Sequence, residues 1–251
     1  MRRSERKSAI LDRVTSTGSV DVTDLAKALG VSGATIRRDL QTLSRDQLLV
    51  RTHGGAVARE ATDELPAQVK ATRRHPEKLR IGRAAAELVE DGAVIGMTGG
   101  STAMELARAL AGRQNITIVT NAIDIAAELV GRSGIHFIVI GGIVRQSSEA
   151  VGRAAEAMLA QYHLDIAFIG VDGLSSEEGC TTYDEMEAQT DVAFLRRARR
   201  TVVIADSSKL GKVTFAHISP ISEVDDVVTD RDADPDQIVA LGHAGVRVVS
   251  V

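Results

Sequence analysis

Six short apolar segments, rich in β-branched residues, constrain the fold of this chain more than any other feature. They are VIGM, ITIVT, IHFIVI, IAFIG, TVVIA and DVVT, and they lie within residues 94–229. They lack the polar alternation of strands with one exposed face, which predicts strands buried on both faces. Helically spaced stretches lie between or after them, namely MELARAL, DIAAELV, AEAMLAQY, MEAQTDVAFLRRA and PDQIVALGH. The pattern therefore predicts an α/β domain with a mainly parallel sheet.

The carboxyl ends of these predicted strands are small and polar. In parallel sheets, ligands bind beyond this edge. One strand runs into a loop of glycines and hydroxyl residues before a helix, a combination that suits a phosphate. The candidate ligand-binding residues at these ends are Thr98, Gly99, Gly100, Ser101, Thr102, Thr120, Asn121, Gly141, Gly142, Arg145, Asp172, Gly173 and Lys209. Together they suit a phosphorylated sugar, although any single glycine pair could simply turn the chain.

The N-terminal segment has the spacing of a helix-turn-helix. A first helix is expected from about Ser4 to Ser16, Thr23 can cap a second, and Gly30 can end it. Ser32 can cap a third helix, in which isoleucine and two leucines recur at positions i, i+4 and i+7 and face inward. A helix, a tight glycine turn and another helix form the plan of this motif.

The outward face of the third helix is small, basic and amide-bearing. Such a face can enter the DNA major groove, where arginine pairs with guanine and glutamine with adenine. The stretch LLVRTHGGAV after it reads as a small hairpin, or wing, with a basic tip. The candidate DNA-binding residues are Ser32, Ala34, Thr35, Arg37, Arg38, Gln41, Arg51 and His53. The alternative is that Arg37 and Arg38 only solvate the helix and pair with Asp39 or nearby acids.

Charge is divided unevenly along the chain. Residues 1–59 contain eleven Lys/Arg and six Asp/Glu, whereas the remainder contains nineteen and twenty-eight. A basic segment attached to an acidic one favours contact between the first segment and a polyanion, because Lys and Arg along phosphates release condensed counterions.

The motifs resemble those of the DeoR family of bacterial transcription regulators. VTDLAKALGVSGATIRRDLQTL followed by LLVRTHGGA is similar to its N-terminal helix-turn-helix, and GGSTAMELA, VVTNAIDIA, IGGIVR, FIGVDG, the Glu187–Ala188 pair and ADSSKLG match its effector domain in order. The resemblance implies a winged helix-turn-helix domain at residues 3–58, a linker at 59–75 and an effector domain at 76–251, related in fold to ribose-5-phosphate isomerase. It also places Glu187 in the effector site. Many members have Asp where this chain has Thr98, so the preferred effector could differ.

Enzymatic activity is not expected. Asp172 and Glu187 could act as bases, but the segment GLSSEEGCTTYDEM between them lacks the Lys that the related isomerases place there. Lys209 could substitute from another loop. We favour a binding site that has lost the chemistry. Two alternatives stay open, a sugar-phosphate isomerase with an accessory nucleic-acid domain and a metabolite-binding module whose basic head docks an acidic protein.

Several other classes are disfavoured. The chain has no P-loop, complete G-x-G-x-x-G or G-x-S-x-G motif, and its six histidines lack metal-site spacing, so no cofactor or metal is expected. The single cysteine, the charged start and the lack of a long apolar run favour a cytoplasmic protein without a membrane span. The expected protein is a repressor that binds double-stranded operator DNA as a homo-oligomer, a dimer or tetramer, because one small module makes few contacts.

Overall fold

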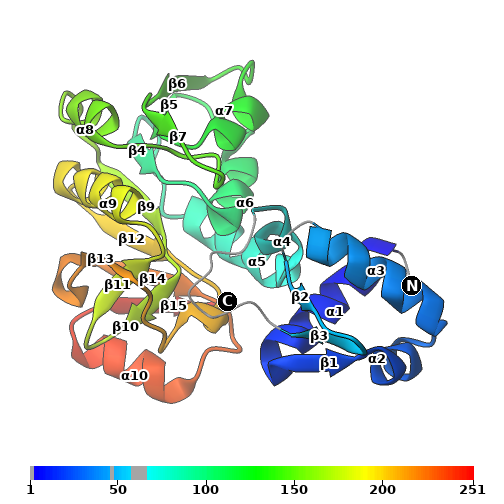
Figure 1. The fold of residues 1–251 in the computed structure, drawn as a ribbon. Coiled ribbons are helices and arrows are strands. Elements are labelled where there is room, and N and C mark those ends of the chain that lie inside the picture. The colour runs from blue at the N-terminus through cyan, green and yellow to red at the C-terminus, as the bar shows by residue number, and fades with distance from the viewer. Residues whose placement is uncertain (1–2, 46–47, 58–66) are drawn as a thin grey trace. The chain divides into compact units, whose positions relative to one another are not determined.

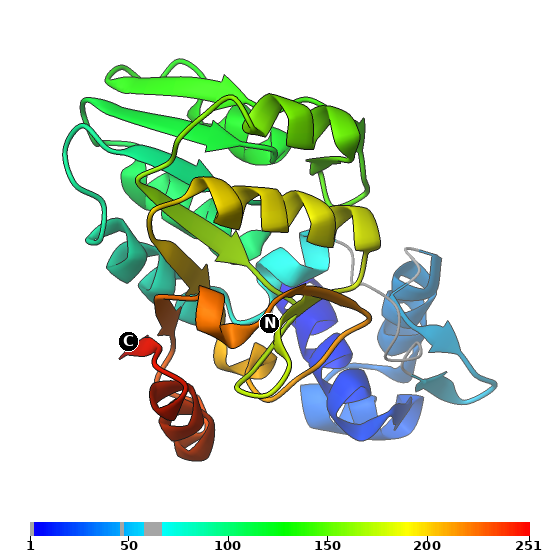
Figure 2. The same ribbon diagram turned by 90° about the vertical axis from the view of Figure 1, so that its left-hand side faces the viewer.

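The computed structural model describes residues 3–45, 48–57 and 67–251, and the chain divides into two units at Arg73 and Arg74. We call residues 1–73 the head and residues 74–251 the body (Figures 1 and 2). Among the described residues, no helix is both long and apolar enough to cross a membrane.

The head is a winged helix-turn-helix. Its elements are α1 (Arg3–Thr17), β1 (Ser19–Asp21), α2 (Val22–Leu29), α3 (Gly33–Arg45), β2 (Val50–Arg51), β3 (Gly55–Val57) and α4 (Ala67–Thr72). The three strands form an antiparallel sheet in the order β1-β3-β2, so the predicted wing is a hairpin whose second strand also pairs with β1. The predicted inward seam is confirmed, since Ile36, Leu40 and Leu43 of α3 are buried with Ile10 and Leu25.

The caps of the head helices match the predictions with one exception. Gly30 ends α2 in the left-handed conformation, at φ 65°, and the Ser32 hydroxyl accepts the Thr35 N–H at 3.2 Å. The prediction that Thr23 caps α2 was wrong. The cap is Asp21, whose carboxylate accepts the Thr23 N–H at 2.6 Å because β1 holds Asp21 extended immediately before the helix.

The segment predicted as a linker, 59–75, lies partly outside the described residues. Within it, α4 occupies Ala67–Thr72, and Val69 is buried in the apolar cluster of the head. Residues 67–72 of the segment are therefore helical, and the Val69 side chain anchors this helix to the head. The next helix, α5 (His75–Ala86), begins the body with Pro76 in its first turn, where proline is well tolerated.

The body contains the predicted parallel sheet. Its seven strands are β4 (Val94–Met97), β5 (Ile116–Thr120), β6 (Ile135–Val139), β9 (Ile166–Gly170), β12 (Thr201–Ile204), β14 (Asp226–Thr229) and β15 (Arg247–Ser250). They lie in the order β15-β14-β12-β9-β4-β5-β6, and every pairing is parallel. Six of them are the six apolar segments of the sequence, and β15 was not predicted.

Helices cover both faces of this sheet (Figure 1). One apolar layer contains side chains of α5, α6 (Ser101–Leu110) and α7 (Ile123–Leu129), and the other contains side chains of α8 (Arg153–Leu159), α9 (Glu185–Arg197) and α10 (Pro235–His243). Covered faces explain why β4, β5, β9, β12 and β14 are mostly buried and lack polar alternation. The prediction of two buried faces was wrong for β6, which lies at the edge of the sheet with His136 and Val139 exposed. The predicted α/β class is confirmed.

Two small antiparallel sheets were not predicted. One joins β10 (Gly173–Ser175), β11 (Gly179–Thr182) and β13 (Ala216–Ser219), and the other joins β7 (Ile143–Val144) and β8 (Ala150–Val151). Both follow strands of the main sheet at its carboxyl edge. They therefore place loop residues of distant segments around that edge.

Candidate functional sites

The outer face of α3 is exposed as predicted. Ala34, Arg38 and Gln41 are exposed opposite the buried seam, and Arg37 is exposed at its flank. Asp39 is only 2% exposed and pairs with Arg6 of α1, with Arg6 Nε 2.6 Å from Asp39 Oδ2. This hydrogen bond raises the pKa of Arg6, although burial alone would lower it. The acid next to the two arginines therefore serves the fold of the head, which weakens the reading that Asp39 neutralises them.

The remaining predicted DNA-binding residues flank this face. Ser32 and Thr35 bond to each other, with their hydroxyl oxygens 2.9 Å apart at the start of α3. Arg51 and His53 are exposed in the wing. The wing turn is closed by the Thr52 N–H, which donates to the Gly55 carbonyl at 3.1 Å. The roles of all eight residues in binding DNA remain predictions.

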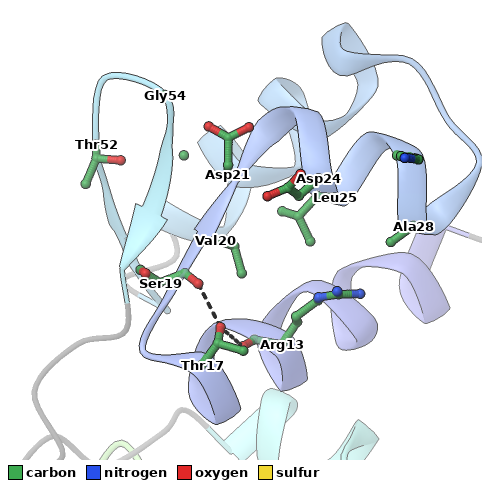
Figure 3. A pocket seen from close by; sticks show the side chains of 12 residues that line it. Arg13, Thr17, Ser19, Val20, Asp21, Asp24, Leu25, Ala28, Thr52 and Gly54 are labelled. Carbon is green, nitrogen blue, oxygen red and sulfur yellow. Dashed lines mark hydrogen bonds between the residues drawn. The ribbon is translucent and has the colours of Figure 1, made fainter.

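A hollow of about 830 Å³ lies in the head between α1, β1, α2 and the wing (Figure 3). Its charged rim is mixed, with Arg13 and Lys27 against Asp21 and Asp24. The Thr17 hydroxyl, which lines the hollow, donates to the Arg13 carbonyl and also lies 2.7 Å from the Ser19 carbonyl. The sequence did not predict this hollow, and it contains none of the candidate DNA-binding residues.

In the body, the predicted charged residues meet at the carboxyl edge of the sheet. Lys209 Nζ lies 2.6 Å from Asp172 Oδ1, and Arg145 forms an ion pair with Glu187. The hydroxyl of Thr182 joins the two pairs, at 2.6 Å from Glu187 Oε1 and 3.5 Å from Asp172 Oδ2. We call these five residues the charged cluster.

The predicted polar residues after β4 and β5 are buried beside this edge. The Thr98 hydroxyl accepts the Gly170 N–H at 2.9 Å, so it ties the end of β4 to β9. Asn121 is fully buried and donates from Nδ2 to the Ala150 carbonyl at 3.2 Å. Its Oδ1 has no hydrogen-bond partner among the described residues. A buried, unsatisfied amide oxygen is costly, so a ligand hydroxyl there would be a favourable donor.

Three glycines of the predicted site have a structural reason to be glycine. Gly142 and Gly173 allow close packing, since a Cβ would lie 2.6 Å from the Val151 carbonyl oxygen and 2.5 Å from the Thr181 hydroxyl oxygen, respectively. Gly100 precedes α6 at φ 105°, a conformation that favours glycine. The rest of the predicted set lies in these same loops and strand ends: Gly99, Ser101, Thr102, Thr120 and Gly141.

Two buried acids of this region were missed. The Glu149 carboxylate accepts the Gly99 N–H at 2.8 Å. Asp191 is 1% exposed, and its pKa is raised, first by burial and then by the charges of Glu187, Glu149 and Asp172. Asp191 follows Glu187 by four residues on α9, so helical spacing could have indicated it. No local pattern points to Glu149.

An ionic network lies at the start of the body. The Arg74 guanidinium is 2.9 Å from Asp232, 3.2 Å from Asp230 and 3.7 Å from Asp206. Lys78 of α5 is buried, with its Nζ 3.7 Å from Asp206. Burial alone would raise the pKa of Asp206, but hydrogen bonds from Ser208 and the charges of Lys78 and Lys209 lower it. Asp206 thus interacts with the first helix of the body and with the charged cluster.

Both parts of the chain match known families. Residues 6–62 match the DeoR-like helix-turn-helix domain, and residues 73–231 match the DeoR C terminal sensor domain. The chain belongs to the DeoR family. The resemblance inferred from the TIRRDL and HGGA motifs is therefore confirmed.

Relatives of this DeoR-family protein are named as repressors. It is 32% identical to the putative aga operon transcriptional repressor of Escherichia coli O157:H7, over 99% of this chain and 94% of the relative. It is 31% identical to the glycerol-3-phosphate regulon repressor of Escherichia coli strain K12, over 92% of each. The protein is therefore a DNA-binding transcription regulator and not an isomerase.

Solved structures resemble the DeoR-family chain in part. The ribose 5-phosphate isomerase A of Methanocaldococcus jannaschii matches 53% of this chain and 52% of its own, with a TM-score of 0.36 and 26% identity. The full-length sorbitol operon regulator SorC of Klebsiella pneumoniae matches 83% and 90%, with a TM-score of 0.38 and 12% identity.

Proposed function

We propose that this regulator represses a sugar or carbohydrate operon and that a phosphorylated sugar controls its binding to operator DNA. The observation that carries the proposal is the charged cluster at the carboxyl edge of the sheet, where Arg145 and Lys209 meet Asp172 and Glu187. The two relatives named above, repressors of an aga operon and of a glycerol-3-phosphate regulon, support a link to carbohydrate metabolism.

At the head, α3 would enter the major groove of double-stranded DNA. Arg38 and Gln41 would read base edges, because both are exposed opposite the buried seam. Arg51 and His53 of the wing would contact backbone phosphate, which positions the helix without selecting sequence. A homo-oligomer, a dimer or tetramer, would place two heads on paired half-sites. We expect the protein to act in the cytoplasm, without a membrane or cofactor.

In the body, the loop Gly99–Thr102 and the start of α6 would bind the phosphate, because a helix N-terminus presents backbone N–H groups. Asp172 and Glu187 would accept hydrogen bonds from sugar hydroxyls, and Lys209 and Arg145 would balance the charge. Asn121 Oδ1 would accept a further hydroxyl. This chain has Thr98 where many family members have Asp, so the site lacks that carboxylate, and the Thr98 hydroxyl accepts the Gly170 N–H instead.

Effector binding would reach the DNA-binding unit through the start of the body. Asp206 interacts with Lys209 on one side and with Arg74 and Lys78 on the other, and Arg74 directly follows the head. A sugar phosphate that changes the partners of Lys209 would therefore change the electrostatic potential at Arg74. If the effector binds one arrangement of the protein about 100-fold more tightly than the other, the coupling free energy between effector binding and DNA binding is about 2.7 kcal/mol.

The test is fluorescence anisotropy of a labelled duplex from the upstream region of the protein's own gene, with competitor DNA and a panel of sugar phosphates. We expect specific binding that one compound releases. Specific binding that the compound tightens would keep the regulator and reverse the sign of its response. Binding that no sugar phosphate alters would refute the proposed effector class.

A further inference from the structure

The loop proposed to bind phosphate already holds an anion from the protein itself. Glu149 Oε1 accepts the Gly99 N–H at 2.8 Å, and Glu149 is only 5% exposed. A Cβ at Gly99 would lie 2.5 Å from the Glu149 carboxyl carbon. A side chain at position 99 would therefore require the Glu149 carboxylate to move away from the loop.

This carboxylate lies among other acids. Glu149 contributes to the raised pKa of Asp191, together with Glu187 and Asp172. The cations of the charged cluster bind Glu187 and Asp172, through Arg145 and Lys209. A carboxylate so placed gains from the adjacent N-terminus of α6, where the helix dipole favours negative charge, but it is repelled by its acidic neighbours.

The backbone of Glu149 is held independently of its side chain. Its carbonyl accepts the Arg145 N–H at 2.9 Å, and the next residue, Ala150, donates from its N–H to the Asn121 carbonyl at 2.8 Å. Movement of the carboxylate away from Gly99 therefore does not require these backbone hydrogen bonds to break. Its departure would open the loop beside Asn121, whose fully buried Oδ1 has no hydrogen-bond partner among the described residues.

We propose that Glu149 is a built-in competitor that occupies the phosphate position of the sensor until a phosphorylated ligand displaces it. This inference rests on the proposed function, and it assigns a specificity residue within the same site. A phosphate dianion brings more charge and more acceptor oxygens than a carboxylate, so it can replace Glu149 at the helix N-terminus. An uncharged sugar cannot, so Glu149 makes the sensor reject unphosphorylated sugars.

The experiment compares inorganic phosphate binding by the full-length protein and two variants, using calorimetry at constant ionic strength. Glu149→Gln keeps a neutral acceptor of the same shape. It should bind phosphate roughly tenfold more tightly than wild type, because a charge-assisted hydrogen bond is about twice as strong as a neutral one. Glu177→Gln, in the exposed turn between β10 and β11, removes the same charge and should bind like wild type.

Amide chemical shifts of Gly99–Thr102 in the same titrations show where the phosphate binds. If all three proteins bind phosphate with equal affinity and the shifts occur in this loop, Glu149 does not compete with phosphate, although the loop is still the phosphate site. Weaker binding by Glu149→Gln would overturn the competition as well, since Glu149 would then assist the anion. No phosphate binding in any of the three would overturn both the competition and the proposed phosphate position.

Thermal melting of each variant verifies that it folds. If Glu149→Gln does not fold, Glu149→Asp carries the test, because it keeps the charge but withdraws the carboxylate from Gly99 by one methylene. Tighter phosphate binding than wild type is expected for this variant too, and unchanged or weaker binding would contradict the proposal.

Discussion

Replacing Arg38 by alanine tests the proposed reading helix most directly. Arg38 is exposed on α3, and the acid next to it, Asp39, is bonded to Arg6. Because the guanidinium is exposed, it can reach a base edge, where a bidentate contact discriminates against a wrong base by about 1 to 3 kcal/mol. Arg38→Ala should weaken operator binding by about 5- to 150-fold, since 1.4 kcal/mol corresponds to a factor of about ten.

The assay is anisotropy with the operator duplex and with single-base variants of it, at several salt concentrations. Arg38→Ala should relax the sequence preference at one position. Arg51→Ala, on the wing, should instead weaken binding to all duplexes alike and reduce the salt slope by about 1, as expected for a phosphate contact.

The matched control is Arg132→Ala, which removes the same charge from an exposed position of the body. It should bind the operator like wild type. If Arg38→Ala and Arg132→Ala bind with the same affinity and the same sequence preference, then Arg38 does not read a base and the proposed orientation of α3 is refuted.

Three further results are expected. Lys209→Met should keep operator affinity within about twofold but weaken the response to the effector at least about tenfold, because Asp172 loses its cation. An unchanged response in the anisotropy titration would show that Lys209 is not part of the site. Asp206 has a lowered pKa, so the stability it contributes is present above about pH 4 and is lost as the pH falls through its lowered pKa. In urea unfolding, the free energy of unfolding should therefore fall less between pH 7 and pH 3 for Asp206→Asn than for wild type. Equal decreases in the two proteins would contradict this. Burial raises the pKa of Cys180 to about 12, so its thiol should resist a thiol reagent at pH 8 until the protein unfolds, and rapid labelling of the native protein would argue against that burial.

Local patterns were sufficient for the secondary structure that carries the function. The buried seam of α3, the Ser32 cap and the Gly30 turn depend on spacing within one or two helical turns, so the sequence alone indicated them. The six predicted strands were found because each is short, mainly apolar and rich in β-branched residues, and lies between polar turns. The cap of α2 was misassigned, because Asp21 and Thr23 are both good caps and only the position of β1 decides between them.

The charged residues of the sensor were partly predictable for a related reason. Carboxyl ends of parallel strands share one edge, so Asp172 and Lys209 could be expected near one another without knowledge of the strand order. Their contact at 2.6 Å agrees with that expectation.

By itself, the sequence determined the fold class, the two-part organisation, the family and the outward face of α3, because each follows from periodicity or from motifs read along the chain. Only the tertiary structure decided that Asp39 bonds to Arg6, 33 residues away, and that Glu149 bonds to Gly99, 50 residues away. Such pairs depend on how helices and strands pack and on which loop folds over which strand end. Hydrophobic spacing specifies which residues are buried, but it carries no information about which buried acid meets which donor.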